Sequence, residues 1–144
     1  MAAHKDYSAT PLWRKLGIAA GARVHVADPP EGFDEALEAL APLPDGVSFL
    51  RRPAKDLDVI LVGTTRRADL ERRFLPLARS LAPAGRLWVA WPKKAAAVQT
   101  DVDFAAVHEI GLAAGLVDNK SASITTEFQG LQFVVRLTDR PRVR

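Results

Sequence analysis

The segment at residues 57–63, Leu-Asp-Val-Ile-Leu-Val-Gly, constrains the fold of this chain more than any other. It is an almost unbroken apolar run, and a strand that is apolar on both faces must be covered on both faces. Parallel sheets with helices on either side provide that cover. The run therefore predicts the central strand of an α/β sheet. With 144 residues, of which 48% are hydrophobic, the chain is long enough to bury a core.

Segments on either side of this run alternate between strand and helix patterns. Further strands are expected at residues 23–27, 47–50, 86–91, 117–125 and 131–137. Helices are expected at residues 10–17, 33–40, 64 or 65 to 85, and 100–114. This order predicts a three-layer, Rossmann-like α/β sandwich of about six strands, in which a mostly parallel sheet ends in a C-terminal antiparallel hairpin. We expect a single domain over residues 1–144, with a capped helical segment at 1–21 and a frayed basic tail at 138–144.

Several residues mark the expected helix ends. Thr10 can accept backbone N–H bonds at the start of the first helix, and Gly17 can end it. Thr64 or Thr65 is expected to cap the long helix in the same way. Pro76 interrupts the pattern of that helix, so a kink or a break is expected there.

The later part of the chain carries two further local signals. Thr100 and Asp103 resemble a capping box for the last helix, and Gly115 is expected to end that helix. The connection at residues 51–56 is too short to hold a crossover helix. It must run back extended across the sheet edge, or the strand at 47–50 is irregular.

Composition excludes several classes of function. The chain has no cysteine, so disulfides and thiolate metal sites are not available, and no residue spacing indicates a metal site. The net charge is only +3, and acidic residues are interleaved with the basic ones along the chain. The arginines near the C-terminus have no aromatic residues between them, so nucleic-acid binding is not expected. No segment has the pattern of a signal peptide or a bilayer span, which predicts a cytoplasmic protein without membrane contact.

The turn after the strand at 23–27 is unlike a cofactor-binding turn. Nucleotide-binding folds place a glycine-rich loop there, because its backbone N–H groups approach the ligand closely. This chain has Asp28, Pro29, Pro30 and Glu31 instead. The two prolines remove two N–H donors, so no cofactor is expected.

From residue 57 onward the chain resembles the C-terminal half of Rossmann-like S-adenosylmethionine-dependent methyltransferases. The resemblance rests on the apolar strand that contains Asp58, the passage Leu-Ala-Pro-Ala-Gly-Arg-Leu at 81–87, and the final hairpin. It implies the fold of those enzymes. The chain departs from their pattern in three places. The turn described above has no glycine-rich loop, and at residues 51–52 two arginines replace the acidic residue that holds the cofactor ribose. One strand-helix unit is also missing before residue 47.

The whole chain also resembles a small bacterial family of unknown function, domain family 3052. The residues that carry this resemblance are Tyr-Ser-Ala-Thr-Pro-Leu at 7–12, Lys-Leu-Gly-Ile at 15–18, Pro-Glu-Gly-Phe at 30–33 and Trp-Pro-Lys-Lys at 91–94. Membership implies a reduced methyltransferase-like fold and a bacterial origin, and it implies no activity.

The carboxyl ends of the strands predict one candidate ligand site. In an open α/β sheet the ligand crevice lies beyond these ends, where the strand order reverses. The loops expected there bring together the following candidate residues: Asp28, Glu31, Thr64, Thr65, Arg66, Trp91, Lys93 and Lys94. A small anionic ligand is the expected occupant, held by the lysines and the start of the helix near Thr65. The alternative is that a threonine only caps the helix, Arg67 pairs with Glu71, and the lysines are solvated.

The histidines and tryptophans add little chemistry. His25 lies inside a strand with no second metal ligand at a suitable spacing, so a structural role is expected. His108 is expected at a helix surface or boundary. Regular pleating places Trp88 and Trp91 on opposite faces of their strand.

Two functions remain open from the sequence. The first is a non-catalytic, methyltransferase-like domain that acts as a binding or interaction module, without S-adenosylmethionine-dependent methyltransferase activity. The second is an enzyme or binder of a small anionic or nucleotide-like molecule in the crevice. An exposed strand at the edge of the sheet also predicts a homodimer through that edge.

Overall fold

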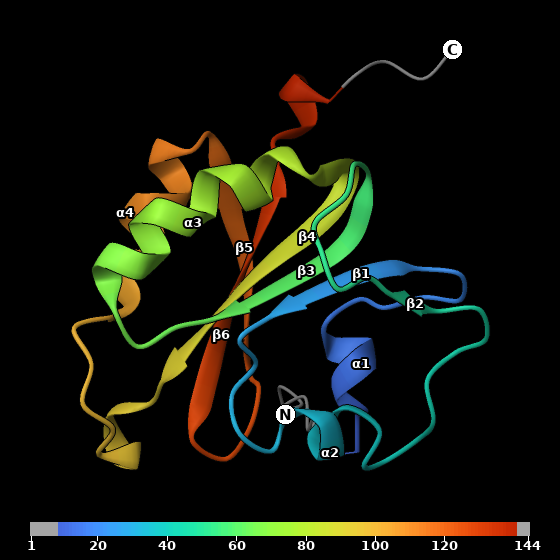
Figure 1. Cartoon of the computed structure of the whole chain (residues 1–144), viewed down its shortest axis with the longest axis horizontal. Coiled ribbons are helices and arrows are strands. Elements are labelled where there is room, and N and C mark those ends of the chain that lie inside the picture. The colour runs from blue at the N-terminus through green and yellow to red at the C-terminus, as the bar shows by residue number, and fades with distance from the viewer. Residues whose placement is uncertain (1–8, 141–144) are drawn as a thin grey trace, which may run out of the picture.

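The computed structural model describes residues 9–140, which form a six-stranded sheet flanked by helices (Figure 1). The strands are β1 (Arg23–Ala27), β2 (Ser48–Phe49), β3 (Leu57–Gly63), β4 (Leu81–Pro92), β5 (Leu116–Ser123) and β6 (Phe128–Val135). The α-helices are α1 (Leu12–Lys15), α2 (Phe33–Leu37), α3 (Arg67–Arg79) and α4 (Phe104–Ala113), and the 3-10 turns are η1 (Lys94–Ala96) and η2 (Leu137–Asp139). Residues 1–8 and 141–144, which include parts of the expected N-terminal segment and basic tail, lie outside the described residues.

The sheet confirms the expected fold class. Its strand order is β2-β1-β3-β4-β6-β5, and the first four of these strands run parallel. β6 runs antiparallel to both β4 and β5. Its Phe133 pairs with Leu87 and its Phe128 with Pro92, so the last strand is inserted next to β4 as expected.

Two apolar cores lie on opposite faces of the sheet. α3 and α4 cover one face, where Phe74 is buried, and α1 and α2 cover the other, where Leu16 is buried (Figure 1). Trp91 belongs to the first core and Trp88 to the second, which confirms that the two side chains point in opposite directions. The buried Nε1–H of Trp88 donates to the Leu16 carbonyl oxygen at 3.1 Å, so burial leaves no unpaired donor there.

Strongly patterned segments have the expected bounds. β1 and β3 begin and end where the sequence predicts, and every apolar residue of β3 is buried, whereas Val26 and Ala27 of β1 are half-buried. Gly17 and Gly115 end α1 and α4 with φ of +83° and +89°, values that glycine adopts without a Cβ penalty. The predicted cap at Thr10 is wrong, because α1 begins one residue later and Pro11 occupies its cap position with no side-chain bond.

The expected end of the long helix is wrong. α3 continues through Pro76 without a break and ends at Arg79, and residues 81–85 belong to β4 rather than to the helix. The pairing passes from Leu57 with Leu81 to Val59 with Arg86, so residues 82–85 form a bulge at the start of β4. Pairing with β3 therefore outweighs the helical spacing at Leu81.

The short link between β2 and β3 has no helix. β2 contains only two residues, and the chain returns from its end to the start of β3 through residues 50–56. In Figure 1 this link crosses the face of the sheet that carries α3. The absence of a helix agrees with the expectation, whereas the link crosses a face of the sheet rather than its edge, and β2 is short with regular pairing to β1. Among the described residues, no helix has the length and apolar character that a bilayer span requires.

Candidate functional site

The candidate residues at the carboxyl ends of β1, β3 and β4 line separate hollows rather than one. Five of the candidate residues, Asp28, Glu31, Thr64, Thr65 and Arg66, line a hollow of about 440 Å³ beyond β1 and β3. The other three, Trp91, Lys93 and Lys94, line a larger hollow of about 870 Å³ beyond β4, beside the β5–β6 hairpin. The structure therefore divides the candidate residues into two groups.

The first hollow is closed at its floor by the turn that follows β1. Gly63 ends β3, and a Cβ atom built on it would lie 2.1 Å from the Asp28 carbonyl oxygen. Asp28 itself has a φ of +47°, which turns its backbone toward that strand end. The space next to Gly63 is thus filled by the chain itself. A ligand group cannot approach the backbone there.

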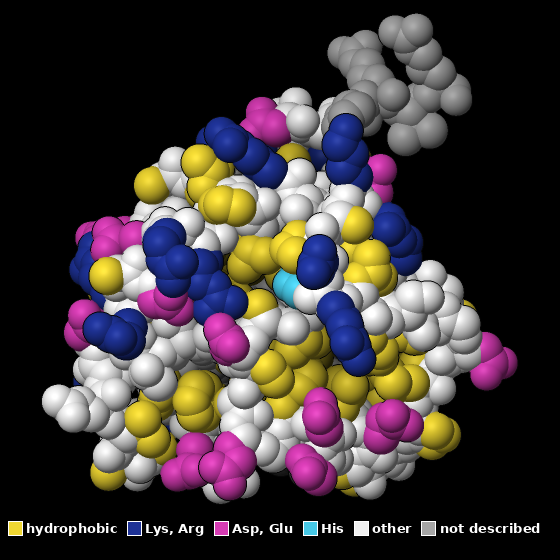
Figure 2. All heavy atoms as spheres, in the orientation of Figure 1, with side chains coloured by type: hydrophobic (Ala, Val, Ile, Leu, Met, Phe, Trp, Pro, Cys, Tyr) yellow, Lys and Arg dark blue, Asp and Glu magenta, His cyan; other side chains and the backbone are white. Residues whose placement is uncertain are grey.

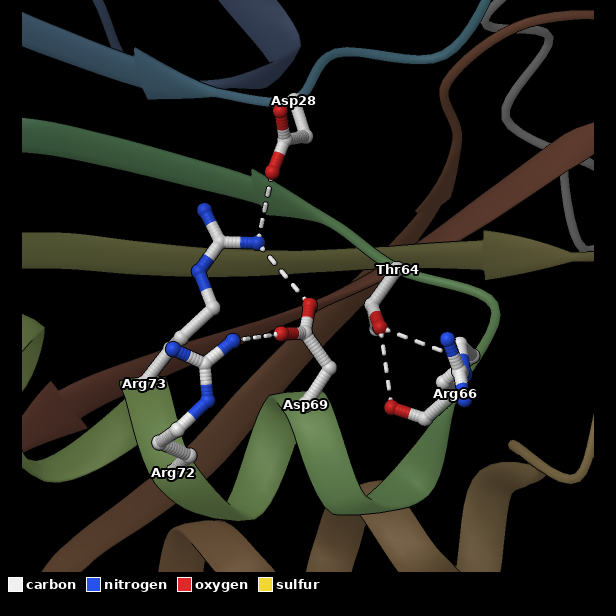
Figure 3. Close-up of polar contacts among 6 residues, drawn as sticks. All are labelled: Asp28, Thr64, Arg66, Asp69, Arg72 and Arg73. Carbon is white, nitrogen blue, oxygen red and sulfur yellow. Dashed lines mark hydrogen bonds and ion pairs between the residues drawn. The ribbon is translucent and has the colours of Figure 1, made fainter.

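Ion pairs hold this turn against α3 (Figure 3). Arg73 donates from Nη1 to Asp28 Oδ2 at 2.7 Å and to Asp69 Oδ2 at 3.1 Å, and Arg72 pairs with the other Asp69 oxygen. Burial acts to raise the pKa of Asp69, but the hydrogen bonds from Arg73 and Arg72 outweigh it and lower that pKa. Asp69 therefore stays ionised. Its two arginines are engaged with the protein's own carboxylates.

The start of α3 is capped by another loop. The predicted caps at Thr64 and Thr65 are wrong, because Arg66 occupies the cap position and its side chain makes no capping bond. Thr64 Oγ1 bonds to the N–H and the carbonyl of Arg66, which forms a local turn (Figure 3). The first N–H of the helix, on Arg67, instead donates to Asp101 Oδ1 at 2.7 Å. A carboxylate of the chain already occupies the place where an anion would bind.

The loop before α4 is hydrogen-bonded to the loop before α3. Thr100 Oγ1 donates to the Thr65 carbonyl oxygen at 2.6 Å and accepts from the Val102 N–H at 3.0 Å. Asp103 caps α4 by accepting from the Ala106 N–H at 2.8 Å. The predicted capping box of Thr100 with Asp103 is therefore wrong, because α4 begins at Phe104 with Asp103 itself as the cap and Thr100 bonds within the preceding loop.

The two lysines differ in their contacts. Lys93 Nζ donates to Ser123 Oγ at 2.7 Å and to the Thr125 carbonyl oxygen at 3.1 Å, so it fastens the hairpin loop to the end of β4. Lys94 is exposed and forms no ion pair within residues 9–140. Trp91, buried to all but 3%, forms part of the wall between this hollow and the core. Arg67 pairs with Glu109 at 3.2 Å and more distantly with Glu71 at 3.9 Å.

Both described histidines have structural partners. His25 is buried, and its Nδ1 lies 2.8 Å from the Leu50 carbonyl oxygen, which requires Nδ1 to carry the proton. His108 Nε2 lies 3.1 Å from Asp118 Oδ1 at the surface. Within the described part of the chain, no three His, Cys, Asp or Glu side chains are grouped so that they could hold a metal ion.

Two features of the site were not found from the sequence. Asp69 and Arg73 stand four residues apart on one helix, so their pairing could have been found from spacing alone. Asp101 lies 34 positions from the N–H that it caps, and no local signal indicates that contact.

Comparisons with known proteins agree on the fold. No protein-family model matches the chain, and the search of curated proteins finds no match. Magnesium protoporphyrin IX methyltransferase from Synechocystis PCC 6803 is similar in structure, with a TM-score of 0.56 and 9% identity over 83% of this chain and 76% of that one. A SAM dependent methyltransferase from Aquifex aeolicus has a TM-score of 0.53 and 15% identity over 87% of this chain and 88% of that one. The chain therefore has a methyltransferase-like fold.

Proposed function

We propose that this chain is a methyltransferase-like domain without S-adenosylmethionine chemistry, and that it works as a binding module. The observation that carries the proposal is the contact between the Asp28 carbonyl oxygen and Gly63, which places the chain's own backbone against the end of β3 at the floor of the crevice between β1 and β3. Ligands of open α/β sheets bind in that crevice, where the strand order reverses. A fold can persist after its site is lost.

The donor set at the crevice also does not fit the cofactor. Pro29 and Pro30 have no N–H to offer, and the first N–H of α3 is bound to Asp101. Arg51 and Arg52 follow β2, where a carboxylate would be needed to hold the ribose hydroxyls. These residues support a domain that recognises another molecule rather than one that transfers a methyl group.

The likeness to the bacterial family of unknown function belongs to the same proposal. It is supported by the turn at residues 30–33 and by the segment at 91–94, which border the two hollows. Membership would place this arrangement in a group of small bacterial domains, and it adds no activity to the proposal.

Calorimetric titration with S-adenosylmethionine and with its demethylated product tests the proposal. We expect no binding tighter than about 10 μM, which corresponds to roughly −7 kcal/mol. A methyltransferase of the same fold, titrated in the same buffer, shows that the cofactor is intact. Binding of either compound in the low micromolar range would overturn the proposal.

A second candidate function is the binding of a small anion in the larger hollow. It is favoured by the position of Lys94, which is exposed beside Trp91 and has no ion pair with a described residue. In this proposal the group Asp28, Glu31, Thr64, Thr65 and Arg66, which lines the smaller hollow, does not contact the anion.

Titration with pyrophosphate and with adenosine monophosphate tests this second candidate. Lys94→Ala should weaken binding severalfold and leave the melting temperature nearly unchanged, because exposed lysines add little to stability. Lys55→Ala, which removes an equally exposed lysine far from the hollow in sequence, is the matched control. If neither compound binds, or if both variants bind equally well, the candidate is refuted.

A further inference from the structure

A third hollow lies over β1, on the face of the sheet that carries α3. It has a volume of about 560 Å³, and we call it the β1 groove. Its apolar residues on this face are Ala27, Pro53, Pro76 and Leu77, and its arginines are Arg51, Arg72 and Arg73. None of the candidate functions above uses this groove except through Asp28, which lies at its border.

The groove exists because the link between β2 and β3 contains no helix. Parallel strands are normally joined by a crossover that includes a helix, and this helix covers the face of the sheet. Here the link occupies only residues 50–56, so β1 is flanked on this face by α3 on one side and by an extended segment on the other (Figure 1). The place of one covering helix is left open.

Hydrogen bonds at both ends hold the extended link in place. At its start, the Leu50 N–H donates to the Val24 carbonyl oxygen at 2.8 Å, and the Leu50 carbonyl accepts from His25 Nδ1 at 2.8 Å. At its end, Arg23 Nη1 donates to the Lys55 carbonyl oxygen at 2.7 Å. The wall of the groove is therefore formed before anything binds, which lowers the entropic cost of binding.

The rim of the groove is positively charged. Asp28 is the one acidic side chain among the described residues that line it, and it is already paired with Arg73. Arg51 and the adjacent Arg52 are exposed, and within residues 9–140 neither makes an ion pair or a side-chain hydrogen bond. Figure 2 looks onto this face and shows Lys and Arg side chains (dark blue) on both sides of an apolar area (yellow), with a histidine (cyan) between them.

We infer that the β1 groove binds an acidic, amphipathic helix of a partner protein. The inference rests on the proposed function, because it names the binding surface of the module. A helix is the element that covers a parallel sheet at this position, and its apolar stripe would pack on Ala27, Pro76 and Leu77. Its carboxylates would face Arg51 and Arg52. No Phe, Tyr or Trp lines the groove within the described residues, and the His25 ring that does is buried and bonded to the Leu50 carbonyl oxygen, which disfavours base stacking there.

A synthetic peptide tests the inference with the intact chain. The probe is a fluorescent helix of about four turns with leucine and alanine on one face and glutamate along both flanks. Fluorescence anisotropy at about 50 mM salt should show saturable binding that weakens severalfold at about 300 mM salt. The same peptide with lysine in place of glutamate should not bind.

The paired substitution Arg51→Glu and Arg52→Glu is the decisive variant. Both side chains are exposed, so the melting temperature should change little, while the affinity for the glutamate peptide should fall at least about tenfold. The matched control is Arg14→Glu with Arg136→Glu, which makes the same change in net charge at exposed arginines outside the groove. The control pair should bind the peptide as the unmodified chain does, within about twofold.

Amide chemical shifts show where the peptide binds. The shifts should change at Val26, Ala27 and Leu77, which line the groove, and not at Lys94 or Ser121 beside the larger hollow. The inference would be overturned if the peptide did not bind, if the chemical-shift changes were confined to the larger hollow, or if both variant pairs lost affinity equally. Competition for the peptide site by a second copy of the chain or by duplex DNA would also overturn it. If neither the peptide nor S-adenosylmethionine and its demethylated product bind, the inference about the groove is refuted and the proposed binding module is not. If S-adenosylmethionine or its product binds, the proposed function is refuted whether or not the peptide binds.

Discussion

Gly63 is the residue of β3 that the turn after β1 contacts. Because its side chain is only hydrogen, the Asp28 carbonyl oxygen can lie against the end of β3. We predict that Gly63→Ala lowers the free energy of unfolding by about 1–3 kcal/mol, since the added methyl group would displace the turn after β1. Denaturant unfolding measures the change.

A comparison with Gly21→Ala separates this clash from backbone strain. Gly21 has a φ of +75° but open space around it, so its substitution strains the backbone without displacing a neighbour. Amide shifts of Asp28 and Glu31 should therefore change only in the Gly63 variant. Unchanged shifts there would show that the turn does not depend on Gly63.

Asp69 predicts a pH dependence of stability. Its pKa is lowered in the folded protein from a usual value of 3.8, because the hydrogen bonds from Arg73 and Arg72 outweigh the effect of burial. We predict that Asp69→Asn is less stable than the unmodified chain at neutral pH, and that this gap narrows as the pH falls below 3.8. In that range the unfolded carboxyl takes up a proton while the folded one stays ionised. The gap closes below the folded pKa.

Denaturant unfolding at several pH values between about 6 and 2 measures the gap. Arg79→Gln changes an exposed side chain at the end of the same helix that does not titrate in this range, so its difference from the unmodified chain should stay flat. A gap for Asp69→Asn that is constant, or that widens on acidification, would contradict the prediction.

Two aspartates cap the N-terminal ends of α3 and α4. Asp103 caps its own helix, α4, whereas Asp101 caps α3 from a distant loop. We predict that Asp101→Ala and Asp103→Ala each lower the free energy of unfolding by about 0.5–2 kcal/mol. Asp45→Ala, at an exposed position whose side chain makes no hydrogen bond or ion pair with another described residue, should change it by less than about 0.5 kcal/mol. Thermal unfolding of the three variants decides whether the cap from the distant loop is as strong as the local one.

The molecule as a whole protects both edges of its sheet. β2 is only two residues long, and β5 carries Asp118 and Lys120 on either side of a register shift. Short strands, charged residues and bulges are features that oppose edge-to-edge pairing. These features weigh against the homodimer expected from the sequence, which stays a prediction.

Light scattering during gel filtration measures the assembly directly. We predict a mass near 15.7 kDa, the value for one chain, at concentrations up to about 100 μM. Lys120→Val, which removes a charge from the edge, should make the chain more prone to associate. A mass of twice the monomer value for the unmodified chain would restore the edge-paired homodimer.

The sequence alone determined the order and type of the main elements. The apolar run at Leu57–Gly63, the strand Arg23–Ala27 and the final hairpin were all predicted, because hydrophobic periodicity and turn residues act over a few neighbouring positions. The same local rules predicted the missing helix between β2 and β3 from the length of the link.

The tertiary structure alone decided how these elements end and what meets at the site. β4 begins at Leu81 because β3 pairs with it, Asp101 caps a helix 34 positions away, and the candidate residues fall into two hollows. The closed crevice and the open groove over β1 arise in the same way. Each depends on contacts between residues that are far apart along the chain, and no local pattern of side chains encodes such contacts.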